Sequence, residues 1–295
     1  MGRLQHWRCK YDSSSPAEAA VSKVAPSPLR ARGEARAVFS RIGAVSRPAR
    51  VFESGGLRLR FPRTAGPCEA VLINTGGGMA GGDRALVELD LESGADVLAT
   101  TQSAEKIYRS EGEAAEVETR LALAEGARLA WTPQETILFE SARLERRLEA
   151  DVAEGAWLLL IESAVFGRLA MGEESIEASF KDRWRIRRGG RLVFAEALRI
   201  EHAAAALRRP AVGRDARAIA SFLFMAPEAA AHLERIRGLF DEIAARSGAP
   251  LEAAASALDG FIVARALSPD PARLRSGVLA VMMALTDRAA PRVWQ

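Results

Sequence analysis

Five carboxylates stand at the ends of apolar segments or inside them, where unpaired charge is expensive. They are Asp83, Glu135, Glu140, Glu162 and Glu173. Glu162, for example, follows the apolar run 158–161 directly. Two interpretations remain open at this point. The carboxylates pair with arginines such as Arg109 or Arg168, or they line a water-filled passage, where they would attract divalent cations weakly and release them.

The residue types that usually carry catalysis are scarce. The sequence has no Gly-x-Ser-x-Gly or His-Glu-x-x-His motif. Its histidines (His6, His202 and His232) lie far apart, and its cysteines (Cys9 and Cys68) form no C-x-x-C pair. Neither cysteine has a basic neighbour in sequence that would mark it as a nucleophile. These observations favour a protein that is not an enzyme and has no tight metal site.

A glycine-rich turn precedes the first of the five carboxylates. Its glycines, which follow the apolar run 71–73, are Gly76, Gly77, Gly78, Gly81 and Gly82. The spacing fits G-x-G-x-x-G, but a dinucleotide loop must open a helix, and residues 85–91 alternate apolar and polar as a strand does. We therefore expect a structural turn, either plain or facing a partner surface or channel. An enzyme that uses this turn and Asp83 on a small substrate remains the less favoured alternative.

A repeat indicates how these residues are positioned. LDLESGADVLATTQ (89–102), LALAEGARLAWTPQE (121–135) and EADVAEGAWLLLIES (149–163) each read as a strand, an acidic turn and a second strand. The turns share Gly94, Gly126 and Gly155, at spacings of 32 and 29 residues. Such periods suggest stacked units that bury their apolar faces against one another, although three unrelated hairpins are the alternative. The fold class predicted is mainly β, a β-helix-like stack of short strands with two α-helices towards the C-terminus.

The Ser/Pro-containing residues 1–35 are expected to form a loosely ordered arm. Residues 36–225 form the β body of a single domain 36–295, and 226–295 form its helical part. One helix is predicted from Pro227 to Arg246 and another from Pro271, with a strand over 261–267 between them. Arg235 and Arg237 fall on the solvent side of the first helix, so they are candidates for a partner interface.

Composition limits the functional classes. The 295 residues are 48% hydrophobic and 27% charged, with a net charge of +3 and a pI near 9.2. Acidic and basic residues are interleaved, which disfavours nucleic-acid binding. No stretch approaches the roughly 18 apolar residues of a membrane span, and the N-terminus does not read as a signal peptide. We expect a cytoplasmic protein.

Several ordered motifs resemble one protein family. They are GGD at 81–83, TTQSAEKIYRS at 100–110, WTPQETILFE at 131–140, FGRLAMGE at 166–173 and PRVW at 291–294. Together they resemble the urease accessory protein UreD (also called UreH), over roughly residues 36–295. Where the family usually has a Pro-Pro-Gly-Gly-like stretch, this chain has Asn-Thr-Gly-Gly-Gly at 74–78.

The resemblance implies a β-helix-like body with two helices and a non-enzymatic scaffold that joins UreF and the GTPase UreG to apo-urease. It also implies nickel delivery through a water-filled tunnel, with no tightly bound cofactor. The carboxylates suit nickel in transit, because tight nickel binding would need imidazole or thiolate ligands. The helical region with Arg235 and Arg237 would then be a candidate UreF surface. A β-solenoid adaptor with no metal role remains the alternative.

Overall fold

The computed structural model describes residues 30–64, 66, 68–173 and 176–295. Most of the predicted N-terminal arm lies outside these residues. The first strand begins at Arg32, four residues before the predicted start of the β body at 36.

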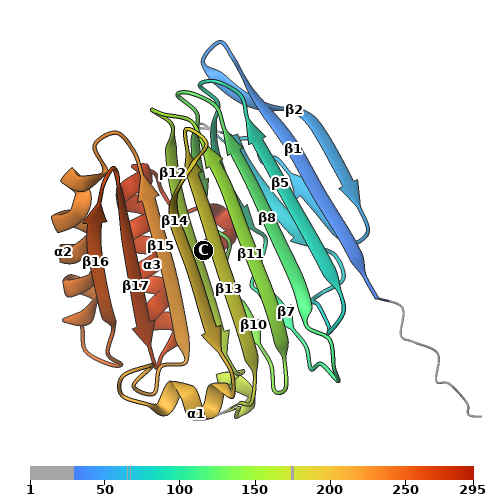
Figure 1. Cartoon of the computed structure of the whole chain (residues 1–295), viewed down its shortest axis with the longest axis vertical. Coiled ribbons are helices and arrows are strands. Elements are labelled where there is room, and N and C mark those ends of the chain that lie inside the picture. Colours follow the sequence, from blue (N-terminus) through green and yellow to red (C-terminus); the bar gives the residue numbers. More distant parts are fainter. Residues whose placement is uncertain (1–29, 65, 67, 174–175) are drawn as a thin grey trace, which may run out of the picture.

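Two large sheets form the body of the protein (Figure 1). Sheet A has the order β14 (Arg191–Ile200), β13 (Ser179–Arg188), β11 (Arg143–Val152), β8 (Ala115–Leu123), β5 (Arg84–Leu91), β1 (Arg32–Ile42), β2 (Val45–Ser54). Sheet B has the order β16 (Glu252–Leu258), β17 (Phe261–Ser268), β15 (Ala218–Met225), β12 (Trp157–Phe166), β9 (Arg128–Trp131), β6 (Asp96–Thr101), β4 (Cys68–Asn74), β3 (Leu57–Arg60). Two short strands, β10 (Thr136–Leu138) and β7 (Glu105–Ile107), extend sheet B beside β12.

The chain winds between the sheets as a solenoid. Strands β5, β8, β11 and β13 pair in parallel in sheet A, as do β4, β6, β9 and β12 in sheet B. The corners at Gly94, Gly126 and Gly155 have φ of 71°, 69° and 78°, a left-handed conformation that favours glycine. The predicted stack of strand–turn–strand units is therefore confirmed.

Apolar and polar residues alternate along the central strands of sheet A, and the apolar side chains fill the interior of the solenoid. In parallel register, Leu89 lies beside Leu121, and Leu121 beside Ala150. All three are nearly fully buried. Most of the alternate residues of the same strands are charged and face solvent. One face of sheet A is therefore core and the other is a charged surface.

The helices cover the outer face of sheet B (Figure 1). Helix α2 (Leu233–Ala244) and helix α3 (Pro271–Thr286) bury an apolar layer against β12, β15 and β17. The start predicted at Pro227 is wrong, because residues 229–232 form a 3₁₀ turn before α2 begins. The start at Pro271 is confirmed, with the Asp270 carboxylate capping the amide N–H of Ala272 at 2.9 Å.

A third helix in the described chain, the short α1 (Ala203–Arg208), was not predicted. It lies at the lower end of the solenoid in Figure 1. The C-terminus returns to sheet B, where the buried Trp294 indole donates a hydrogen bond to Thr100 Oγ1 at 2.8 Å. Gln134 Nε2 donates to the carbonyl oxygen of Val293 at 2.8 Å, so the tail is fixed at two points.

Candidate functional site

Three nearly fully buried charged side chains meet between the two sheets. Glu162 from β12 points inward from sheet B, and Arg146 from β11 and Asp182 from β13 point inward from sheet A. Arg146 Nη2 lies 2.6 Å from Asp182 Oδ2, and Arg146 Nε lies 3.0 Å from Glu162 Oε2. All three side chains are at most 6% exposed. We call these three residues the interior cluster.

Two indoles complete the surroundings of Glu162. Trp131 Nε1 donates a hydrogen bond to Glu162 Oε1 at 2.9 Å. Within the described chain, neither Glu162 Oε2 nor Trp184 Nε1 makes a hydrogen bond of good geometry, although the Trp184 indole is close enough to Glu162 to oppose in part the rise that burial causes in the pKa of its carboxyl. Arg146 Nε instead donates to Asp182 Oδ1 at 3.1 Å. Buried polar atoms without a protein partner are the places where proteins hold internal water.

Burial and the neighbouring charges of opposite sign act in opposing directions on the pKa values of Glu162 and Arg146. Burial raises the pKa of Glu162, and the nearby Asp182 adds to this, while the Arg146 charge acts in the other direction. Burial disfavours the charged form of Arg146, but the attraction of Asp182 and Glu162 outweighs it and raises the pKa of the guanidinium. Arg146 therefore stays charged and has two carboxylates to balance.

Sequence analysis identified Glu162 but missed its partners. The signal was present: Arg146 follows Leu144 and precedes Leu148 on the inward phase of β11, and Asp182 lies between Phe180 and Trp184 on the inward phase of β13. A charged residue on the apolar phase of two neighbouring strands indicates a buried ion pair.

Two other predicted carboxylates are paired with arginines at the surface of sheet B. Glu135 lies 2.8 Å from Arg275 Nη1, and Arg275 stacks over the Trp294 ring at 4.4 Å. Glu173 accepts hydrogen bonds from the backbone amide of Arg168 at 2.8 Å and from Arg168 Nε at 3.0 Å. Hydrogen bonding to the Arg168 side chain, opposed in part by burial, lowers the pKa of Glu173. The predicted use of Arg168 as a partner is thus confirmed for Glu173, whereas Glu162 uses Arg146.

The carboxylates of Asp83 and Glu140 accept hydrogen bonds from backbone amides. Asp83 Oδ1 accepts the amide N–H of Ala31 at 2.8 Å, and Oδ2 accepts that of Ala80 at 2.7 Å. This is the first of the two roles considered for Asp83, and it fixes the start of β1 to the glycine-rich turn. Glu140 is exposed, and its Oε2 accepts the amide N–H of Glu177 at 3.2 Å. Of the five carboxylates, only Glu162 lies between the sheets.

The glycine-rich turn is closely packed. A Cβ at Gly81 would lie 2.0 Å from Ser110 Oγ and 2.3 Å from the carbonyl oxygen of Glu113. Gly78 (φ 150°) packs against the Tyr108 ring. Gly77 and Gly82 have φ of 75° and 86°, in the left-handed region. Gly76 is not in that region, and its amide N–H donates a hydrogen bond to Asn74 Oδ1 at 2.9 Å. Positive φ or close approach therefore requires glycine at 77, 78, 81 and 82, but not at Gly76.

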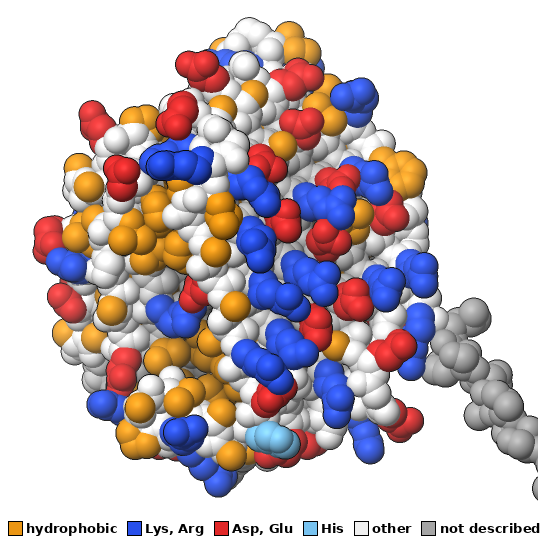
Figure 2. Space-filling view, viewed as in Figure 1, with side chains coloured by type: hydrophobic (Ala, Val, Ile, Leu, Met, Phe, Trp, Pro, Cys, Tyr) orange, Lys and Arg blue, Asp and Glu red, His pale blue; other side chains and the backbone are white. Residues whose placement is uncertain are grey.

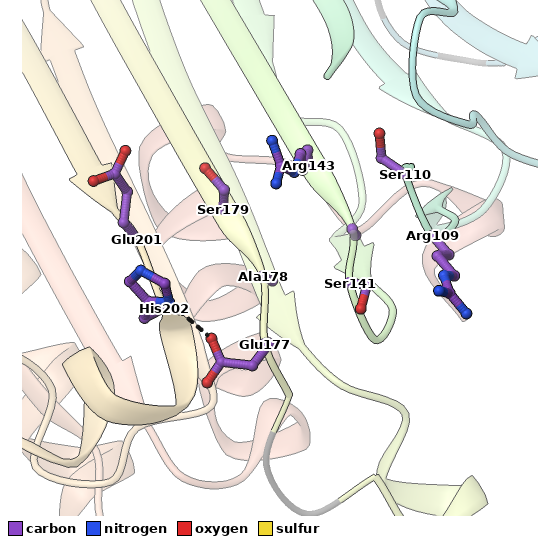
Figure 3. A pocket seen from close by; sticks show the side chains of 10 residues that line it. Arg109, Ser110, Ser141, Arg143, Glu177, Ala178, Ser179, Glu201 and His202 are labelled. Atoms are coloured by element: carbon purple, nitrogen blue, oxygen red, sulfur yellow. Dashed lines mark hydrogen bonds and ion pairs between the residues drawn. The ribbon is translucent and has the colours of Figure 1, made fainter. Parts of the chain in front are cut away.

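An open cleft of about 460 Å³ lies at the end of sheet A (Figure 3). His202 Nδ1 lies 3.2 Å from Glu177 Oε2, and Ser110, Ser141 and Ser179 line the same cleft. Among the described residues, no serine hydroxyl is hydrogen-bonded to the His202 ring. The His202 side chain is 84% exposed. The cleft therefore lacks the buried, connected base that activates a serine.

The two interface candidates on α2 differ. Arg237 bonds the carbonyl oxygen of Ala255 on the edge strand β16, at 2.9 and 3.2 Å, and pairs with Glu234. Arg235 is exposed and has no bonded side-chain partner in the described chain. Only Arg235 is therefore free to contact a partner without breaking an internal contact.

The described residues contain no group of three or more His, Cys, Asp or Glu side chains arranged to hold a metal ion. A membrane-spanning helix is likewise not found in the part of the chain that the structure describes. The fold and the interior cluster thus define a two-sheet β-solenoid with buried ion pairs and a helical cover.

Comparison with known proteins identifies the family. The model of the UreD urease accessory protein family matches residues 31–295. The chain is 46% identical over 275 residues to the urease accessory protein UreD of Methylobacterium sp. (strain 4-46), covering 91% of this chain and 96% of that protein. It is 48% identical over 277 residues to UreD 2 of Methylorubrum populi, covering 92% of each chain, and 44% identical over 284 residues to UreD of Xanthobacter autotrophicus, covering 95% and 96%.

The chain belongs to the UreD urease accessory protein family. The resemblance seen in the motifs is confirmed. Proteins of this family are accessory factors and not enzymes, so the expectation of a non-enzymatic protein is also confirmed.

Proposed function

We propose that this protein is a urease maturation factor that binds apo-urease together with UreF and the GTPase UreG, and helps deliver nickel to the urease active site. Nickel is its cargo, and no cofactor is tightly bound. The place of action is the cytoplasm. Membership of the UreD family supports the role in urease maturation, and the interior cluster supports the passage of a cation.

The single observation that carries the nickel route is the position of Glu162. Crossing a protein through apolar packing would strip a cation of its water at prohibitive cost. A route between the sheets therefore needs oxygen ligands and water, and Glu162 offers a carboxylate oxygen, Oε2, that faces Arg146 at 3.0 Å but accepts no hydrogen bond of good geometry from the described residues. The raised pKa of Glu162 suits weak, exchangeable binding, because the carboxylate is easily neutralised by a proton or a cation.

A second candidate function is an adaptor that never contacts metal. The observation that favours it is the pairing of Glu135, Glu162 and Glu173 with arginines, since each guanidinium competes with a divalent cation for its carboxylate. An adaptor would need the same partners and the same fold, but no continuous path between the sheets.

The test is co-expression of apo-urease, UreF and UreG with and without this chain, followed by measurement of nickel per urease active site. We expect nickel to fall when the chain is omitted and to return when it is restored. Equal nickel contents would contradict the maturation role. To separate the conduit from the adaptor, Glu162→Gln should slow nickel delivery while the complex with UreF still forms, because Glu162 is the predicted carboxylate that lies between the sheets. The same test at Glu173, predicted from the sequence to line the passage, uses Glu173→Ala and a large apolar residue at that site. Nickel delivery at the wild-type level by all of these variants would favour the adaptor.

A further inference from the structure

The solvent face of sheet A carries its charge unevenly. Besides Arg143 at the start of β11, which donates to the carbonyl oxygen of Gly112 at 3.2 Å, five outward side chains of β11 and β13 are cationic: Arg147, Lys181, Arg183, Arg185 and Arg187. Three outward carboxylates accompany them: Glu145, Glu149 and Asp151. Figure 2 shows Lys and Arg side chains (blue) gathered in a band across the middle of the molecule. We call the five cations the basic band.

One carboxylate, Glu145, lies among three of these cations, while Arg187 pairs with the other two carboxylates, 3.5 Å from Glu149 and 3.8 Å from Asp151. Glu145 lies 2.7 Å from Lys181 Nζ and 3.7 Å from both Arg147 Nη2 and Arg183 Nη2. Its hydrogen bond to Lys181, together with the charges of Lys181, Arg183 and Arg147, lowers the pKa of Glu145 despite partial burial. Three cations share one anion, so part of their charge is left uncompensated.

Arg185 adds to the excess. It is exposed, and its side chain has no ion-pair or hydrogen-bond partner among the described residues. In register, it lies between Glu149 of β11 and Ala195 of β14, and Arg183 lies between Arg147 and Ala197. Because alanines flank both arginines on the β14 side, nothing there screens the guanidinium groups from an approaching surface.

On β1, β5 and β8, the same face carries paired charges, in contrast to the basic band. On β1, β5 and β8, Glu88 lies 3.1 Å from Arg36 and 2.8 Å from Arg120. Arg120 also pairs with Glu118 at 2.7 Å. If the charged side chains of this face served only to keep the sheet soluble, positive and negative charges would be expected to balance on every strand.

We propose that the basic band docks an acidic surface of a protein partner within the urease maturation complex. The inference therefore rests on the proposed function. Carboxylates interleaved with the cations, such as Glu149, would repel the evenly spaced phosphates of a nucleic acid. A protein surface can match such a mosaic, placing carboxylates against Arg183 and Arg185 and cations against Glu149. Exposed arginine also offers the bidentate geometry that carboxylates accept.

The test compares two charge-reversal variants of the full chain. Arg183→Glu/Arg185→Glu changes the basic band. Arg47→Glu/Arg50→Glu makes the same charge change on β2, at the opposite edge of sheet A, where both arginines are exposed and have no bonded partner in the described chain. Binding to purified apo-urease and to the purified UreF–UreG complex is measured at about 50 and 300 mM NaCl, because salt screens exposed charges. Thermal melting confirms that both variants are folded.

We expect the basic-band variant to bind at least one of the two partners about tenfold more weakly than the control variant at low salt, with the difference shrinking at high salt. Arg183→Lys/Arg185→Lys should retain most of the affinity. Equal binding of the two charge-reversal variants overturns the docking proposal and leaves the proposed function standing. A wild-type chain that binds neither partner overturns both. Binding to a duplex DNA is measured in parallel, and a band variant that loses only DNA binding would show that the acidic partner is nucleic acid and overturn the proposal.

Discussion

Removing Arg146 should destabilise the protein strongly. Arg146→Met leaves Glu162 and Asp182 facing each other with 3% and 4% of their side chains exposed and no cation between them. Breaking a buried ion pair from one side usually costs about 3–5 kcal/mol. For a large domain, where 1 kcal/mol shifts the melting temperature by about 2–4 °C, that corresponds to a fall of roughly 6–20 °C.

The matched control is the next residue in the chain. Arg147 lies on the outward phase of β11 with 52% of its side chain exposed. Arg147→Met removes the same charge and should change the free energy of unfolding by less than about 0.5 kcal/mol. The assay is urea unfolding of both variants, followed by circular dichroism. Equal unfolding midpoints for the two variants would refute the buried ion-pair account.

The pH dependence follows from the raised pKa of Glu162. A carboxyl whose pKa is higher in the folded state stabilises the fold at pH values below its ordinary pKa, and this contribution is lost as pH rises through the folded-state pKa. Glu162→Gln has no carboxyl to titrate at this position, so it does not lose this contribution as pH rises. The free energy of unfolding of the variant relative to wild type should therefore increase from acid towards neutral pH. The deficit of Arg146→Met should shrink in acid, because protonation relieves the unpaired carboxylates. A deficit independent of pH would contradict this assignment.

Three further outcomes are expected. Asp83→Ala loses both amide hydrogen bonds and should cost about 1–3 kcal/mol in urea unfolding, with urease activation falling only as far as the folded fraction does; activation lost at an unchanged folded fraction would instead place Asp83 on the route. Gly81→Ala should lower the melting temperature more than Gly77→Ala, because a Cβ at Gly81 meets backbone and one at Gly77 meets nothing within 4 Å; the reverse order would contradict the packing. Trp294→Ala should cost about 3–5 kcal/mol by calorimetry, since the ring is buried and hydrogen-bonded; a small change would show that the C-terminal tail is not anchored.

The solenoid could be predicted because its signals are local. Apolar and polar residues alternate along each strand, and a positive-φ glycine recurs about every 30 residues, at Gly94, Gly126 and Gly155. Each repeat therefore shows the same local pattern. The helix start at Pro227 failed for a tertiary reason. A 3₁₀ turn is inserted there before the chain enters the layer over sheet B, and local propensity does not report it.

The site was predicted only in part, because its ion pairs join residues that lie far apart in the sequence. The apolar run before Glu162 shows that its carboxylate is buried, but not which cation meets it, since Arg146 lies on the opposite sheet. The same holds for Glu135 and Arg275, which are 140 residues apart in the chain. Period-two phase alone places Arg146 and Asp182 on the apolar side of their strands, and applying it strand by strand would have found the interior cluster.

The most direct test of the nickel route is the nickel content of urease matured with Glu162→Gln. The substitution keeps the size of the side chain and an oxygen to accept the Trp131 indole N–H, but removes the charge. Apo-urease, UreF, UreG and either form of the chain are combined, and nickel per urease active site is measured over time at equal amounts of assembled complex. The account predicts that the complex forms normally and that nickel enters more slowly with the variant. Delivery at the wild-type rate by a fully assembled Glu162→Gln complex would contradict a route through the interior cluster.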